Sequence, residues 1–162
     1  MEIKITWHDG RWSVVLDGVL VDTFDSAQSA MERKTEIELR LLTQEAAKAG
    51  REQGAAAASW YFDGNTPDEM YLRVARGIED GDPEVLDSFP SSPLSGEYAD
   101  GMVPAVVLDA LGVPQDHDWA DDLLTAFEDG FYAACHESIE ATALGFARGS
   151  AARAAFDAQE GR

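Results

Sequence analysis

The sequence has one cysteine, three histidines and no long apolar run, and each shortage excludes a class of protein. Cys135 has no partner within the chain, so an intrachain disulfide is excluded and a reducing, cytoplasmic compartment is expected. No apolar run reaches the roughly eighteen residues of a transmembrane helix, so none is expected. Met1 to Lys4 lack the basic-then-apolar plan of a signal peptide, so we expect none.

Sequence patterns of known catalysts are missing as well. The chain contains no Gly-x-Ser-x-Gly elbow, no phosphate-binding P-loop and no glycine pattern for dinucleotides. The sequence therefore favours a non-enzymatic protein without a cofactor. An enzyme built on carboxylate pairs stays open, because only the fold could bring such pairs together.

Basic residues are scarce relative to acidic ones. Twelve Lys and Arg stand against 31 Asp and Glu, for a net charge of −19. Such a chain repels phosphates, so neither nucleic acid nor an anionic membrane is expected as a direct ligand, whereas a basic protein is. The alternative is that the acidity serves only solubility. Few lysines, many arginines and abundant alanine are typical of a GC-rich genome or a salt-adapted host.

The negative charge is concentrated in one region. Residues 61–147 hold nineteen acids and two bases, whereas residues 1–60 hold ten acids and seven bases. Residues 148–162 hold two acids and three bases. Solubility alone explains the total charge better than it explains this segregation.

Residues 2–24 predict a three-stranded antiparallel meander. Apolar and polar residues alternate in three short runs, which is the period of a strand with one buried face. Asp9-Gly10 and Asp17-Gly18 separate the runs, and Asp-Gly favours tight hairpin turns because both residues tolerate positive φ.

An apolar stripe of helical period follows and predicts one long helix over residues 27–62. Asp25 or Ser26 can cap its start. Gly50 and Gly54 fall inside it and each costs about 1 kcal/mol relative to Ala. We therefore expect a long helix with a kink at the two glycines, a break there being the alternative.

Start and stop signals predict shorter helices after it. Thr66 is the expected N-cap of one helix, with Glu69 completing a capping box and Gly81 ending the helix. Asp82-Pro83 begins another. Further helices are expected over residues 104–111 and 116–146, and Gly130 and Gly145 mark places in the last one where helices could pack closely.

Together these elements predict an α+β protein. Residues 1–50 would form a βββα module, residues 51–148 an acidic helical domain and residues 149–162 a C-terminal tail.

The last long helix carries the leading candidate site. Acidic residues recur there at helical spacings, which predicts one negatively charged face. Such an array presents negative charge much as a phosphate backbone does, so it could bind a protein built to hold nucleic acid. A solvated face without a partner is the alternative. The candidate partner-binding residues are Asp116, Asp118, Asp121, Asp122, Glu128, Asp129, Glu137 and Glu140.

The same segment holds the candidates for a metal site. His117, Asp121, Cys135 and His136 are competent zinc or transition-metal ligands. Their spacing matches no established metal-binding pattern. Cys135 also lies on the apolar stripe, where a lone cysteine is usually a small buried apolar residue.

Three short patterns resemble a known group of proteins. Trp60 to Thr66 (WYFDGNT), Gly77 to Pro83 (GIEDGDP) and Pro93 to Glu97 (PLSGE) resemble small acidic proteins, themselves uncharacterised, that bacteriophages of GC-rich, actinobacterial-type hosts encode. The likeness runs over residues 54–137, about half of the chain, with Phe127 to Phe131 (FEDGF) as a later match, and it transfers no catalytic residue. It implies a phage or mobile-element inhibitor of a host system that handles nucleic acid, of the anti-restriction or anti-CRISPR kind.

The sequence thus leaves three functional hypotheses. The first is a non-enzymatic, DNA-mimic interaction protein that binds a basic, nucleic-acid-binding partner. The second is a metal-binding protein or metal-dependent enzyme. The third is a structural or scaffold protein, acidic only for solubility, that forms a homodimer through the long helix.

Overall fold

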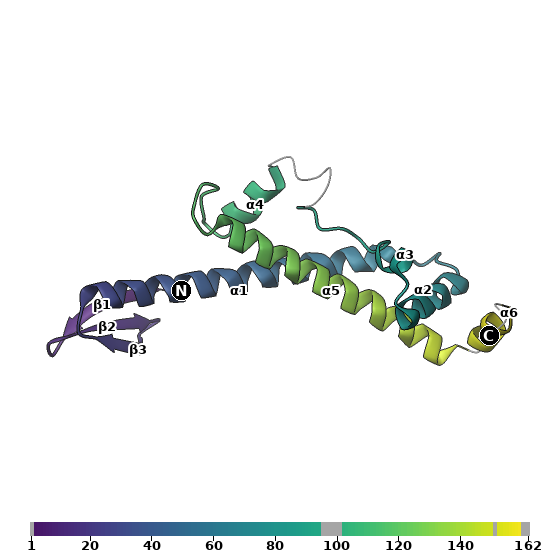
Figure 1. The fold of residues 1–162 in the computed structure, drawn as a ribbon, viewed down its shortest axis with the longest axis horizontal. Coiled ribbons are helices and arrows are strands. Elements are labelled where there is room, and N and C mark those ends of the chain that lie inside the picture. Colours follow the sequence, from purple (N-terminus) through teal and green to yellow (C-terminus); the bar gives the residue numbers. More distant parts are fainter. Residues whose placement is uncertain (1, 95–101, 151, 160–162) are drawn as a thin grey trace. The chain divides into compact units, whose positions relative to one another are not determined.

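The computed structural model describes residues 2–94, 102–150 and 152–159. It confirms the α+β class, with an N-terminal antiparallel sheet followed by a long helix and further helices (Figure 1). The elements are β1 (Ile3–His8), β2 (Arg11–Leu16), β3 (Val19–Phe24), α1 (Ala27–Tyr61), α2 (Asp68–Asp80), α3 (Pro83–Leu86), α4 (Met102–Ala110), α5 (Ala120–Gly149) and α6 (Ala152–Gln159).

The chain divides into two compact units, residues 1–45 and 46–162. The first contains the sheet and the beginning of α1, and the second contains the rest of α1 and the other helices. The division at residues 50/51 and 148/149 stays a prediction. Among the described residues, no helix is both long and apolar enough to cross a membrane.

The predicted meander is confirmed. The strand order is β1-β2-β3, and both neighbouring pairs are antiparallel. Asp9 and Gly10 have φ of 49° and 79°, and Asp17 and Gly18 have φ of 48° and 84°. Positive φ at both turn residues is what a two-residue hairpin turn needs, and Asp and Gly reach it at low cost.

The core of the first unit lies between one face of the sheet and α1. Val14 pairs with Ile5 across β1 and β2, and it is fully buried together with Ala30 and Ile37 of α1. Partly buried apolar side chains from all three strands surround this cluster. The alternation that predicted the strands therefore also selects the face that packs.

In the second unit, α1 packs through a row of small residues spaced by four. Ala46, Gly50, Gly54 and Ala58 are all buried. A Cβ on Gly50 would overlap the backbone carbonyl of Phe127 in α5, and the backbone of α5 equally leaves no room for a Cβ on Gly54. The helix continues through both glycines, so here they permit close contact between two helix backbones.

Gly130 of α5 takes part in the same close contact between the backbones of α1 and α5, because a Cβ on it would overlap the backbone carbonyl of Ala47. The prediction of close packing is confirmed at Gly130. It is wrong at Gly145, where a Cβ would meet nothing within 4 Å.

The predicted cap at Thr66 is wrong, whereas the two signals that follow are confirmed. Thr66 Oγ1 bonds the carboxylate of Asp63 at 3.1 Å, and α2 begins two residues later without a side-chain cap. Gly81 ends α2 in the left-handed conformation, with φ of 68°. Asp82 starts α3 by accepting a hydrogen bond from the Glu84 N–H at 3.0 Å.

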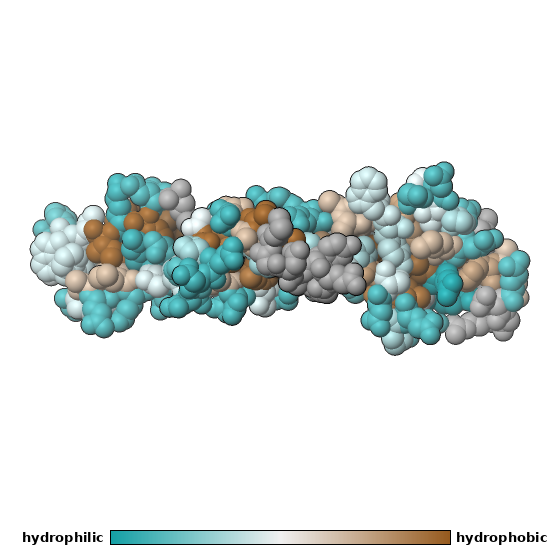
Figure 2. Space-filling view, turned by 90° about the horizontal axis from the view of Figure 1, so that it is seen from above, coloured by the Kyte–Doolittle hydropathy of each residue, from teal (hydrophilic) through white to brown (hydrophobic). Residues whose placement is uncertain are grey.

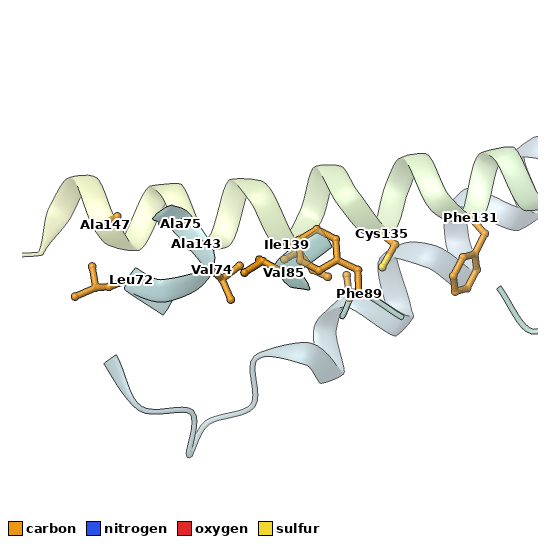
Figure 3. Packing of buried hydrophobic residues seen from close by; sticks show 11 residues of the cluster. Leu72, Val74, Ala75, Val85, Phe89, Phe131, Cys135, Ile139, Ala143 and Ala147 are labelled. Atoms are coloured by element: carbon orange, nitrogen blue, oxygen red, sulfur yellow. The ribbon is translucent and has the colours of Figure 1, made fainter. Parts of the chain in front are cut away.

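A second core lies where α2 and α3 pack on the later part of α5 (Figure 3). Residues spaced by about four along α5, including Cys135, Ile139 and Ala143, face Leu72 of α2 and Val85 of α3. This packing sets the buried face of that part of α5, and hence which of its side chains reach solvent.

Candidate acidic interface

α5 begins at Ala120, later than the predicted start at Asp116. The expectation that all eight acids share one helix is therefore wrong for Asp116 and Asp118, which lie in the turns before it. These turns are held locally. The His117 N–H donates to the Pro114 carbonyl at 3.1 Å, and the Trp119 N–H donates to His117 Nδ1 at 3.2 Å.

The six acids on α5 do not form one straight stripe. At about 100° per residue, Asp121 and Glu128 lie on nearly the same side, whereas Glu137 points about 160° away from Asp121. The six span about 28 Å along the axis at 1.5 Å per residue. They therefore cover about half of the helix circumference, which is a broader surface than a narrow stripe.

The change in the buried face of α5 explains this spread. Leu123 and Phe127 are buried in the first part of the helix, and Ile139 and Ala143 in the second. The two pairs point about 160° apart. The direction of the exposed side therefore changes from the start of α5 to its end, and the acids lie on this exposed side.

Most of the eight acids reach solvent without a basic neighbour. Glu128 is half-buried and the other seven are exposed. Glu137 is paired, because Arg51 Nη2 of α1 lies 2.6 Å from its carboxylate. Within the described part of the chain, no ion pair involves the other seven.

The acids of residues 1–60 contrast with these. Seven of the ten lie within 4.0 Å of a basic group or of His8, namely Glu2, Asp9, Asp22, Asp25, Glu36, Glu38 and Glu52. Negative charge is thus largely balanced locally in the first part of the chain and unbalanced from Asp116 to Glu140.

Helix electrostatics account for two of the unpaired acids. Asp121 and Asp122 lie in the first turn of α5. The partial positive charge of a helix N-terminus stabilises an acid there by about 0.3–1 kcal/mol. Local structure explains none of the remaining unpaired acids, which are Asp116, Asp118, Glu128, Asp129 and Glu140.

The density of charge on α5 is below that of duplex DNA. B-DNA carries one charge per roughly 1.7 Å of axis, or about 17 over 28 Å. The six acids of α5 thus supply about a third of the charge of a duplex of that length. A partner would therefore contact this surface through a few basic side chains, and not through a continuous basic groove of the kind that holds duplex DNA.

The four candidate metal ligands lie in separate environments. His117 packs on Trp119, with the ring centroids 4.7 Å apart, and His136 packs edge-on against Phe89 at 4.8 Å. Cys135 is fully buried in the second core. Within the described residues, no three His, Cys, Asp or Glu side chains gather in a way that could hold a metal ion.

The environment of Cys135 yields a testable expectation. Burial raises the pKa of its thiol above the ordinary value of 9.0. Ionisation of the thiol therefore favours the unfolded chain, and this part of the stability is complete below pH 9 and lost as the pH rises above it. We expect wild type to lose more stability between about pH 8 and pH 10 than Cys135→Ala, as measured by urea unfolding.

Thiol reactivity gives an independent measurement at the same residue. A thiol reagent should modify Cys135 only after urea is added, because the native side chain is inaccessible. Rapid modification of the folded protein, or equal pH dependence of wild type and Cys135→Ala, would contradict the buried environment.

One further hollow, of about 710 Å³, lies between α2, α3 and α6. It contains the two basic residues of the acidic stretch, Arg73 and Arg76, and the guanidinium of Arg76 lies 4.6 Å from the ring of Phe156. Among its described lining residues there is no histidine, cysteine or hydroxyl side chain. Its acidic lining residues are Glu69, Asp80 and Asp82.

Comparisons with protein families, curated proteins and solved structures found no match to this chain. The likeness to phage proteins stays a prediction, and Ser95, Gly96 and Glu97 of its third pattern lie outside the described residues.

Proposed function

We propose that this chain is a non-enzymatic interaction protein whose unpaired carboxylates between Asp116 and Glu140 bind the basic, nucleic-acid-binding surface of another protein. A phage or mobile-element inhibitor of the anti-restriction or anti-CRISPR kind is the specific form we propose. One contrast supports it. Seven of the eight acids of this segment lack a basic neighbour among the described residues, Glu137 being the exception, whereas most acids of residues 1–60 have one.

The physical basis is electrostatic. Asp116, Asp118, Asp121 and Asp122 fall within seven residues and repel one another, because no described base lies among them. A basic surface placed against them replaces this repulsion by attraction. Such complementarity raises association rates by about 10- to 1,000-fold and weakens as salt is added.

The scaffold hypothesis competes with this proposal and differs in what it predicts. Acidity that serves only solubility would give associations that do not depend on salt. The buried row from Ala46 to Ala58 also limits a homodimer through α1, because that side of the helix already packs on α5. A dimer through α1 would have to use another side of the helix.

Capture from lysate of a GC-rich bacterial host tests the proposal. We expect the immobilised chain to retain a basic protein at about 0.05 M salt and to release it at about 0.5 M, where the Debye length falls to a few ångströms. Duplex DNA should displace the same protein, because both ligands would occupy one surface. Retention that neither salt nor DNA affects would refute the proposal.

A further inference from the structure

A hollow of about 450 Å³ lies where the end of α1 meets α2 and α3 in the second unit. Val74 of α2 and Val85 of α3 are buried in its apolar lining, where Met70 of α2 is 38 % exposed. Figure 2 shows brown apolar and teal hydrophilic residues side by side at the surface towards the right of the picture, where α2 and α3 lie. The volume of the hollow falls in the range of about 300–1,000 Å³ that is typical of small-molecule sites.

Two opposite charges line the same hollow without pairing. They are Arg73 of α2 and Glu84 of α3, and both side chains are exposed. Neither side chain forms an ion pair with the other or with any further residue in the described part of the chain. The guanidinium and the carboxylate are therefore both available to a ligand.

The hydroxyl group of Tyr61 adds an acceptor at a fixed place in this hollow. It lies 2.7 Å from Ser88 Oγ, and Ser88 Oγ donates to the Val85 carbonyl at 2.6 Å. A hydroxyl group has one proton, so Tyr61 is the donor in its bond to Ser88, and its oxygen keeps a lone pair for a ligand. Edge-on contacts with Phe62 and Phe89 hold the ring of Tyr61, at centroid distances of 4.9 and 5.4 Å.

We propose that this hollow binds a small zwitterion with an apolar side chain, namely an apolar α-amino acid or a short apolar peptide. Arg73 would bind the carboxylate of the ligand, because a guanidinium matches both carboxylate oxygens. Glu84 and the Tyr61 oxygen would accept hydrogen bonds from its ammonium group. The apolar side chain of the ligand would cover Met70 and Val85, which lie between these polar groups in the lining of the hollow.

The charge of the surroundings selects a ligand that carries both signs. Residues 61–147 hold nineteen acids and two bases, so a ligand with a carboxylate alone is repelled by the surrounding region. A ligand with an ammonium group alone leaves Arg73 without a partner and places a second positive charge beside it. A zwitterion provides a partner for both Arg73 and Glu84 and adds no net charge.

Isothermal titration calorimetry of the full chain tests this proposal with four probes. L-leucine and leucyl-leucine carry both charges, leucinamide lacks the carboxylate, and isocaproate lacks the ammonium group. We expect at least one of the two zwitterions to bind with a dissociation constant below about 10 mM. Each probe with a single charge should bind at least about tenfold more weakly, because one charged group of the hollow loses its partner. The tighter of the two zwitterions shows whether the site suits a free amino acid or a peptide.

A pair of matched variants then assigns the carboxylate contact. Arg73→Gln should weaken binding of the tighter zwitterion at least about tenfold, because an amide carries no charge to meet the carboxylate. Arg40→Gln is the control and should leave binding unchanged. Arg40 is also exposed and without an ion pair to a described residue, but it lies in the first unit.

Three results would overturn the proposal. They are no binding of either zwitterion, equal binding of a zwitterion and of a probe with a single charge, and equal binding by Arg73→Gln and Arg40→Gln. Circular dichroism of each variant shows whether the fold is kept. If Arg73→Gln does not fold, the comparison of the four probes on wild type decides.

Discussion

Gly130→Ala is expected to destabilise the protein, whereas Gly145→Ala is expected to stabilise it. Both glycines lie inside α5, so each replacement gains about 1 kcal/mol of helix propensity. At Gly130 the added methyl group would overlap the carbonyl of Ala47, which belongs to the backbone of α1 and cannot rotate away. Overpacking of this kind costs about 1–3 kcal/mol or more.

Urea or thermal unfolding of the two variants measures the difference. We expect the free energy of unfolding to fall by about 1–2 kcal/mol for Gly130→Ala and to rise by about 0.5–1 kcal/mol for Gly145→Ala. Each is the same chemical change in the same helix, so the sign of the effect reports the close crossing of α1 and α5. Stabilisation by both variants would show that the two helices can separate at little cost.

Neutralising four of the unpaired acids is expected to slow partner binding by about 10- to 1,000-fold at low salt. The variant combines Asp116→Asn, Asp118→Asn, Asp129→Asn and Glu140→Gln, all exposed and without an ion pair to any described residue. Most of the change should appear in the association rate, because long-range attraction steers the encounter. Surface plasmon resonance with the captured partner gives this rate directly.

The control variant changes the net charge by the same amount elsewhere. It combines Asp9→Asn, Asp17→Asn, Glu32→Gln and Glu36→Gln, which are also exposed and lie in the first unit. We expect it to bind within about threefold of wild type, because at a Debye length of about 10 Å distant charges are screened. Equal loss in both variants would mean that only total charge matters, and the scaffold hypothesis would then be preferred.

Local signals in the sequence determined much of the fold. The Asp-Gly turns, the cap at Asp82 and the end of α2 at Gly81 involve residues only a few positions apart, so the sequence alone is enough to predict them. Thr66 shows the limit of this reasoning. Its hydroxyl could either cap the helix that follows or donate a hydrogen bond to the nearby Asp63 carboxylate, and in the structure it donates to Asp63.

The acidic segment shows a similar division. The positions of the acids in the sequence were enough to locate the surplus of negative charge between Asp116 and Glu140. Pairing of Glu137 with Arg51, 86 positions earlier, became visible only when α1 and α5 were placed together. The burial of Cys135 beside the exposed His136 likewise depends on packing, because adjacent residues of a helix point to different sides and the neighbouring helix decides which side is covered.

The sequence by itself therefore determined the order and type of the elements and the location of the charge, because hydrophobic period and turn chemistry are local properties. Tertiary structure decided which faces are buried. Gly50 and Gly54, which in an isolated helix only lower stability, allow α1 and α5 to touch. The buried side of α5 turns along its length as its packing partners change, and this turn spreads the acids over half of the helix.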